Sequence, residues 1–254
     1  MTGYNREAYW DKVAREIGSR EEVKTIAGDD EPYYRYKRAL FLKLFDTIDF
    51  RNRSVLEIGS GPGGNLDYLT KKNCSKIAGV DISPEMVKLS SKLLHGKGIE
   101  VSLIDGIHLP FEKCSYDIVF TSTVLQHNTD EEKLKPLIAE IGRVAGSEVI
   151  LFERIEKTVK GHDTNQGRPV GYYDSMMRQQ GFTLSEKKFL PIQASFYTCG
   201  AIRKVFNSSS RGEGEPISKL SFALETLTLP FTKLLDRVIP SKRDLGMLRF
   251  RRNG

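Results

Sequence analysis

Short β-rich segments alternate with helical patterns from residue 51 onward, and this alternation limits the folds open to the chain. The first five β-rich segments cover residues 54–58, 76–80, 100–104, 116–121 and 148–152. Helix start signals stand between them, such as Ser83 before Pro84 and Asp130 before Glu131. This spacing predicts an α/β fold with a mostly parallel sheet that carries helices on both faces.

The chain divides into three zones. Residues 1–50 have a helical pattern and are predicted to form an N-terminal cap, in which the aromatic and basic cluster 33–38 forms a lid. Aromatic and basic residues also alternate in nucleic-acid-binding segments, so that interpretation of the cluster stays open. Residues 51–206 form the predicted α/β domain, with a helix at 169–180 and late β-rich segments at 182–190 and 198–206. Residues 207–254 are predicted to be a linker and a basic, amphipathic arm.

Composition and charge exclude several classes of protein. Hydrophobic residues make up 39% of the 254-residue chain, too many for a disordered protein. The net charge is +6, and residues 208–254 carry nine Lys/Arg and five Asp/Glu, so +4 lies in the arm. The nearly neutral body argues against a nucleic-acid groove. Three separated cysteines, no metal-ligand spacing, no membrane-spanning run and no signal peptide lead us to expect a cytoplasmic protein.

A glycine-rich turn follows the first β-rich segment, in the sequence 55–65, VLEIGSGPGGN. Glycines let a backbone approach a ligand closely, and the helix that follows presents free N–H groups. Gly59, Gly61 and Gly64 also satisfy the dinucleotide pattern GxGxxG, so the glycines alone do not select a cofactor.

Three successive strands each end near a carboxylate: Glu57, Asp81 and Asp105. Open α/β sheets bind ligands at the carboxyl ends of their strands. Glu57 beside the turn disfavours a diphosphate and favours a cofactor that carries an ammonium and a sulfonium. A nicotinamide-dependent oxidoreductase is therefore the disfavoured alternative.

The sequence resembles the Rossmann-like, class I S-adenosylmethionine-dependent methyltransferases, in the small-molecule group called type 11. The resemblance is carried by residues 55–65, 79–90, 105–120 and 123–127. It implies a seven-stranded sheet whose last strand is antiparallel, which the segments 182–190 and 198–206 fit. It also implies that S-adenosylmethionine is bound by Glu57, Gly59, Ser60, Gly61, Gly63, Asp81, Ile82, Met86, Asp105, Gly106 and Thr121.

The same resemblance places the segment after the fourth strand beside the transferable methyl group. His127 lies there and is the first candidate base, while many relatives use a histidine here only to shape the pocket. His162, in the polar loop after the fifth strand, is the second candidate base. We expect methyl transfer to a small-molecule, saccharide or lipid-linked acceptor, at oxygen. A non-catalytic cofactor-binding module is the other alternative.

The C-terminal arm has apolar residues at alternating spacings of three and four, from Ile217 to Val238, interrupted at Pro230. One interpretation is an amphipathic helix pair that packs on its own domain or on a second copy of the chain. The other is a helix that rests on the anionic inner face of a membrane, helped by the basic residues at 242–243 and 249–252.

Overall fold

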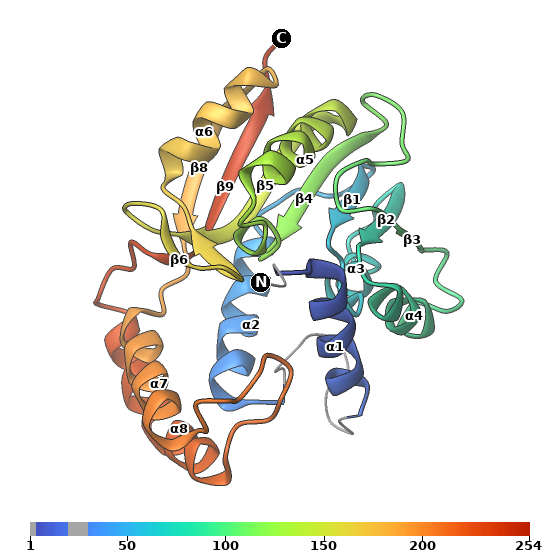
Figure 1. Ribbon diagram of the computed structural model, residues 1–254. Coiled ribbons are helices and arrows are strands. Elements are labelled where there is room, and N and C mark those ends of the chain that lie inside the picture. Colours follow the sequence, from blue (N-terminus) through green and yellow to red (C-terminus); the bar gives the residue numbers. More distant parts are fainter. Residues whose placement is uncertain (1–3, 20–29) are drawn as a thin grey trace.

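A seven-stranded sheet forms the centre of the computed structural model, which describes residues 4–19 and 30–254 (Figure 1). The strand order is β3-β2-β1-β4-β5-β9-β8, and β9 is the antiparallel strand. This confirms the predicted fold class. The strands are β1 (Ser54–Ile58), β2 (Lys76–Asp81), β3 (Glu100–Leu103), β4 (Tyr116–Ser122), β5 (Ala145–Ile155), β8 (Phe182–Phe189) and β9 (Asp244–Arg252).

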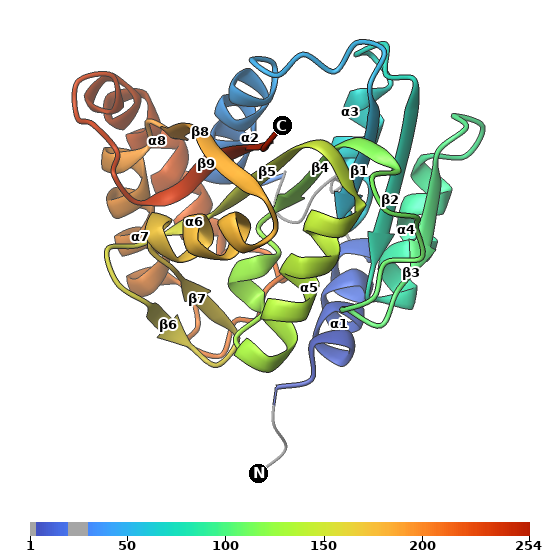
Figure 2. The same ribbon diagram turned by 90° about the horizontal axis from the view of Figure 1, so that it is seen from above.

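Helices cover both faces of the sheet because successive strand side chains point to opposite sides (Figure 2). On one face, Leu56 and Val119 pack against α5 (Glu131–Val144) and α6 (Val170–Gln179). On the other, Val55 and Phe120 pack against α2 (Pro32–Phe45) and α3 (Gly64–Leu69). Helix α1 (Arg6–Gly18) packs on α4 (Pro84–Leu93), largely through Met86.

The segment 198–206, predicted as the last strand, belongs instead to helix α7 (Gln193–Phe206). The Asp236 carboxylate accepts the backbone N–H groups of Ala194 and Ser195, and so satisfies the first turn of this helix. The antiparallel strand comes from the tail, where β9 lies between β5 and β8. The sheet therefore crosses the division predicted at residue 206.

Two of the basic residues that were predicted to flank a membrane, Arg249 and Arg252, instead bind groups within the protein. The Arg249 guanidinium pairs with Glu148 on β5. Arg252 donates hydrogen bonds to the carbonyl groups of Gly142, Ala145 and Gly146 at the end of α5 and the start of β5. These contacts fasten β9 to the body, since Arg and Lys side chains complement the free carbonyls at a helix C-terminus.

Two smaller elements lie at the carboxyl edge of the sheet. Strands β6 (Lys160–His162) and β7 (Asn165–Gly167) form a hairpin, and the short 3-10 helix η1 (Leu125–His127) follows β4. Helices α7 and α8 (Lys219–Asp236) form a helical hairpin at the same end of the molecule (Figure 1). In the described ranges, 4–19 and 30–254, no helix combines the length and apolarity needed to cross a bilayer.

The apolar spacing of the arm does not pack α8 onto its own domain. Leu220, Leu227 and Phe231 are exposed, whereas Glu225 and Asp236 are buried. The interpretation in which this apolar face covers the chain's own core is therefore wrong. Leu229 is the apolar residue that α8 buries, and the other buried residues of the helix are polar: Ser221, Glu225, Thr232 and Asp236.

If the tail strand is part of the core, truncating its buried side chains should destabilise the whole fold. We expect Phe250→Ala to lower the free energy of unfolding by about 3–5 kcal/mol, because it leaves a cavity in a fully buried site. Urea denaturation measures this. Phe206→Ala, at a half-exposed position on α7, is the matched control and should change it by less than about 1 kcal/mol. Equal losses for the two variants would contradict the assignment.

Candidate active site

A cavity of about 790 Å³ opens at the carboxyl edge of the sheet. Its volume is within the range of small-molecule and cofactor sites. The ends of β1 and β2, the turn after β4 and the β6–β7 hairpin form its base and one side. Helices α1 and α2, the start of α7 and residues 211–214 enclose the remainder. Of the predicted site residues, those that line the cavity are Glu57, Gly59, Ser60, Gly61, Asp81, Ile82, Met86, Gly106, His127 and His162.

The glycine-rich turn is closely packed against its neighbours. Gly59 has a φ of 67°, and a Cβ there would come within 2.5 Å of the Val124 side chain. The N–H of Gly61 donates to the Asp81 carboxylate at 2.8 Å, which ties the turn to the end of β2. Gly63, with a φ of 92°, caps α3 behind the cavity and is not part of its lining. The turn thus needs glycine for backbone conformation and close approach.

Glu57 is buried at the cavity wall, and burial raises the pKa of its carboxyl to about 8. The Oε1 atom accepts a hydrogen bond from the Asn65 amide at 2.6 Å, and Oε2 has no partner. The hydroxyl of Ser60 beside it is also buried without a partner. These orphaned oxygens fit a ligand that brings hydrogen-bond donors and positive charge, as the aminoacyl end of S-adenosylmethionine does.

Arg38 is a site residue that the sequence analysis did not single out. It extends from α2 to donate hydrogen bonds to Asn65 and to the carbonyl of Gly64, and it lines the cavity close to Glu57. A guanidinium near a carboxylate complements both ends of an amino acid group. Arg38 belongs to the cluster 33–38, which was predicted to form a lid, and its position in that cluster could have identified it as a site residue. Tyr33, Tyr34 and Lys37 of the same cluster also line the cavity.

Two of the predicted cofactor residues point elsewhere. The Asp105 carboxylate accepts the N–H groups of Ile107 and His108 and also contacts the His108 ring at 2.6 Å. Contact with His108 lowers the Asp105 pKa to about 2. Thr121 is buried and donates its hydroxyl to Glu153. Neither residue lines the cavity, although Ile104 and Gly106 beside Asp105 do.

The turn after β4 is held from both sides by buried charged groups. The Glu153 carboxylate, at the end of β5, accepts the Thr121 hydroxyl and the N–H groups of Val124 and Gln126. Burial raises the pKa of this carboxyl. Arg168 is buried too and donates to the carbonyls of Leu125 and Asn128. Neither Glu153 nor Arg168 lines the cavity, and both act on the backbone that carries His127.

The contacts of His127 define its tautomer. Its Nδ1 lies 2.8 Å from the Thr164 carbonyl oxygen, which only accepts, so Nδ1 carries the proton. The Gln126 amide oxygen accepts the N–H of Arg154, and its NH₂ group therefore faces His127 Nε2 at 3.2 Å. The Trp10 ring on α1 packs against the imidazole in a T-shaped arrangement, with centroids 4.9 Å apart. His127 thus presents an acceptor nitrogen, Nε2, in a buried position at the cavity wall.

His162 enters the same cavity from the β6–β7 hairpin, where its side chain is exposed. Its ring lies 3.2 Å from the Thr164 hydroxyl. The two candidate bases are therefore brought to one cavity by different elements, and only His127 has its ring fixed by buried contacts.

Comparison with known proteins agrees with this geometry. A family profile described as a methyltransferase domain matches residues 56–152, which extend from β1 to β5. Ajmaline N-methyltransferase of Rauvolfia serpentina is 27% identical over 161 residues, which are 58% of this chain and 54% of that protein. The chain spans about half, or less, of the length of the first curated relatives that it matches.

Solved structures share the fold over most of the chain. Magnesium protoporphyrin IX methyltransferase from Synechocystis PCC 6803, with bound S-adenosylhomocysteine, has a TM-score of 0.58 and 15% identity, covering 97% of this chain and 98% of that one. The [4+2]-cyclase SpnF has a TM-score of 0.60 and 14% identity, covering 85% and 80%. At these identities the likeness shows the fold alone.

The sheet order is that of a Rossmann-like fold, and the cavity opens at the carboxyl edge of the sheet. Residues 56–152 match the profile of a methyltransferase domain, the family that the motifs predicted. The two structures of the Synechocystis enzyme contain S-adenosylhomocysteine and S-adenosylmethionine, the cofactor predicted from the motifs.

The raised pKa of Glu57 predicts that cofactor binding is linked to proton release. With a pKa of about 8, this carboxyl is expected to be protonated at lower pH in the free protein, whereas a bound ammonium favours the carboxylate. Near pH 6.5, S-adenosylhomocysteine should release up to one proton, and its affinity should rise as the pH rises toward 7.5. Isothermal titration in buffers of different ionisation enthalpy measures both.

Glu57→Gln should remove the proton release and flatten the pH dependence of affinity. The matched control is Glu100→Gln, at an exposed carboxyl on β3, which should behave as the wild type does. A Glu57→Gln variant that releases as many protons as the wild type would assign the titration to another group.

Proposed function

We propose that the protein transfers a methyl group from S-adenosylmethionine to a hydroxyl oxygen of a small-molecule, saccharide or lipid-linked acceptor held in the cavity. The supporting observation is that one continuous cavity contains both the glycine-rich turn and His127. A site of this kind places acceptor and donor together and excludes water.

The residues divide between the two ends of the cavity. When bound, S-adenosylmethionine supplies an electrophilic methyl group on a sulfonium. Glu57 and Arg38 would hold the ammonium and carboxylate of its amino acid part, and Asp81 would accept from its ribose hydroxyls. Further from the turn, Arg154, Phe196 and His162 line the space left for an acceptor.

His127 is the group that would take the acceptor proton. Its Nε2 is the nitrogen without a proton, so it accepts hydrogen bonds as a neutral base. The amide of Gln126 faces this nitrogen at 3.2 Å, and an acceptor hydroxyl would take the place of that amide. Glu153 and Arg168 then act only by positioning, because they touch the backbone of the turn and not the cavity.

Nitrogen is the second candidate for the methylated atom, and one observation favours it. The similar protein from Rauvolfia serpentina is named as an N-methyltransferase. An amine acceptor that reaches the site uncharged already has the lone pair for attack. Its methylation would therefore depend less on His127 than methylation of a hydroxyl.

An acceptor screen that detects a mass increase of one methyl group tests the proposal. We expect Gly61→Arg to abolish methyl transfer, because the side chain would fill the cofactor end of the cavity. His127→Asn should lower kcat by about 10²–10⁴-fold for a hydroxyl acceptor, with S-adenosylhomocysteine binding retained. His162→Asn, the matched control in the same cavity, should lower kcat by less than about tenfold.

A His127→Asn variant with full activity would restrict that residue to shaping the pocket and would favour nitrogen as the methylated atom. Modification of no acceptor by a protein that binds S-adenosylhomocysteine would favour the non-catalytic alternative.

A further inference from the structure

The outer face of the α7–α8 hairpin is apolar, although it is exposed. On α8 the exposed residues Leu220, Leu227, Phe231, Leu234 and Leu235 recur at helical spacing, and the exposed Val238 lies in the turn that follows the helix. Phe231 is 68% exposed and Val238 is 76% exposed. Twelve of the fifteen large hydrophobic residues that are exposed in the described part of the chain lie between Phe196 and Ile239. A surface concentration of this kind marks an interaction site.

The inner face of α8 buries Leu229, and two buried carboxylates on the same face hold the orientation of the helix through their partners. Glu225 is buried and pairs with Arg203 of α7 at 2.5 Å. Asp236 accepts the Ser195 hydroxyl and the first N–H groups of α7. Rolling the helix to bury its apolar side would leave these carboxylates without partners, which is costly in a buried site. The apolar face therefore belongs outside.

The charges of the hairpin are sorted by face. Glu225 and Asp236 are the two acidic residues of α7 and α8, and they are 0% and 2% exposed. Glu213, in the loop between the two helices, is exposed and lines the cavity. The exposed charges of α7, α8 and the segment that follows α8 are cations: Lys204, Lys219, Arg237 and Lys242. The exposed surface of the two helices and of the segment after α8 thus combines apolar side chains with positive charge. It complements an anionic lipid surface, whereas in a symmetric pair of copies it would bring like charges together.

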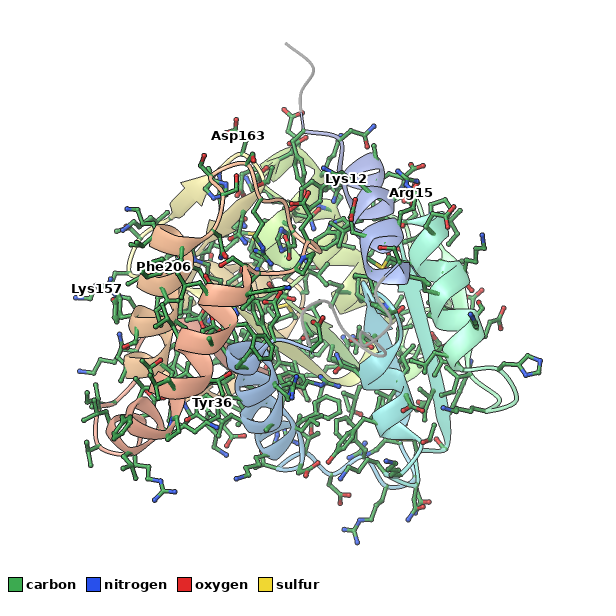
Figure 3. The ribbon with its side chains drawn as sticks, turned by 90° about the horizontal axis from the view of Figure 1, so that it is seen from below. Lys12, Arg15, Tyr36, Lys157, Asp163 and Phe206 are labelled. Atoms are coloured by element: carbon green, nitrogen blue, oxygen red, sulfur yellow. The ribbon has the colours of Figure 1, made fainter. Side chains whose placement is uncertain are left out.

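The hairpin also adjoins the cavity. In Figure 1 it lies below the carboxyl edge of the sheet, the end at which the cavity opens. Phe196 at the start of α7 and residues 211–214, between the two helices, line the cavity itself. Figure 3 looks at this end, with Phe206 on the hairpin and Tyr36 where α2 meets α8. A surface docked on the hairpin would therefore lie beside the cavity.

We propose that the outer face of the α7–α8 hairpin docks the protein on an anionic lipid bilayer, with the apolar side chains in the interface and Lys204, Lys219, Arg237 and Lys242 at the lipid phosphates. This docking requires neither cofactor nor acceptor, so it stands apart from the proposed methyl transfer. It would give the cavity access to an acceptor that resides at the membrane.

The test is co-sedimentation of the full chain with phosphatidylcholine vesicles, with and without about one-third phosphatidylglycerol. Removing the arm is unsuitable because β9 would be lost with it. The hairpin variant is Leu227→Glu with Phe231→Glu, and the matched control is Leu103→Glu with Val159→Glu. The control residues are 53% and 54% exposed and lie outside the hairpin. Both double variants introduce two glutamates, so they change the net charge equally.

We expect the wild type and the control variant to bind the anionic vesicles and the hairpin variant to lose at least about tenfold in partitioning. Lys219→Glu with Arg237→Glu should weaken binding to anionic vesicles and leave binding to phosphatidylcholine unchanged. Circular dichroism and titration with S-adenosylhomocysteine establish that each variant is folded.

Equal partitioning of the wild type and the hairpin variant would overturn the proposal. Failure of the wild type to bind both kinds of vesicle would also overturn it. A wild-type dimer that the hairpin variant converts to a monomer, without vesicle binding, would assign this face to a second copy of the chain. Failure of methyl transfer in every acceptor screen would leave the vesicle result unaffected.

Discussion

The turn after β4, which carries His127, depends on the hydrogen bonds that the buried carboxylate of Glu153 accepts. The carboxylate accepts hydrogen bonds from the Thr121 hydroxyl and from the N–H groups of Val124 and Gln126. The Arg168 guanidinium donates hydrogen bonds to backbone carbonyls of the same turn. An isolated buried charge is costly, so each group has a strong preference for this one arrangement. The position of His127 is therefore set by β5 and by the segment that leads into α6.

At the cofactor end of the cavity, a buried carboxyl lacks the partners that Glu153 has. Glu57 is left with one oxygen unpartnered, and burial raises its pKa. Asp81 is also buried and its pKa is raised, although two N–H groups stabilise its carboxylate. Here the unfavourable burial is relieved by a ligand that carries positive charge, so the same electrostatics explains both the selectivity for the cofactor and the expected proton release.

Some charged residues of the tail form internal pairs that stabilise the fold, and others lie on the surface. Arg249 and Arg252 hold β9 in the sheet, and Glu225 and Asp236 hold α8 on α7. Lys219 and Arg237 remain on the outside beside the apolar face. The excess positive charge of residues 208–254 is thus divided between internal pairs and exposed side chains, a division that a count of charges does not reveal.

The local patterns of the sequence determined the strand–turn–helix unit at Glu57 and Gly61, the carboxylates at the ends of the strands and the class of fold. These features are predictable because a strand period, a glycine turn and a helix cap are set by residues close together in the chain. The tertiary structure alone decided that β9 comes from residues 244–252, that Asp105 and Thr121 turn away from the cavity, and that the apolar side of α8 faces outward. Each depends on partners distant in sequence, such as Glu153 for Thr121 and Arg203 for Glu225, and a one-dimensional pattern does not contain those distances.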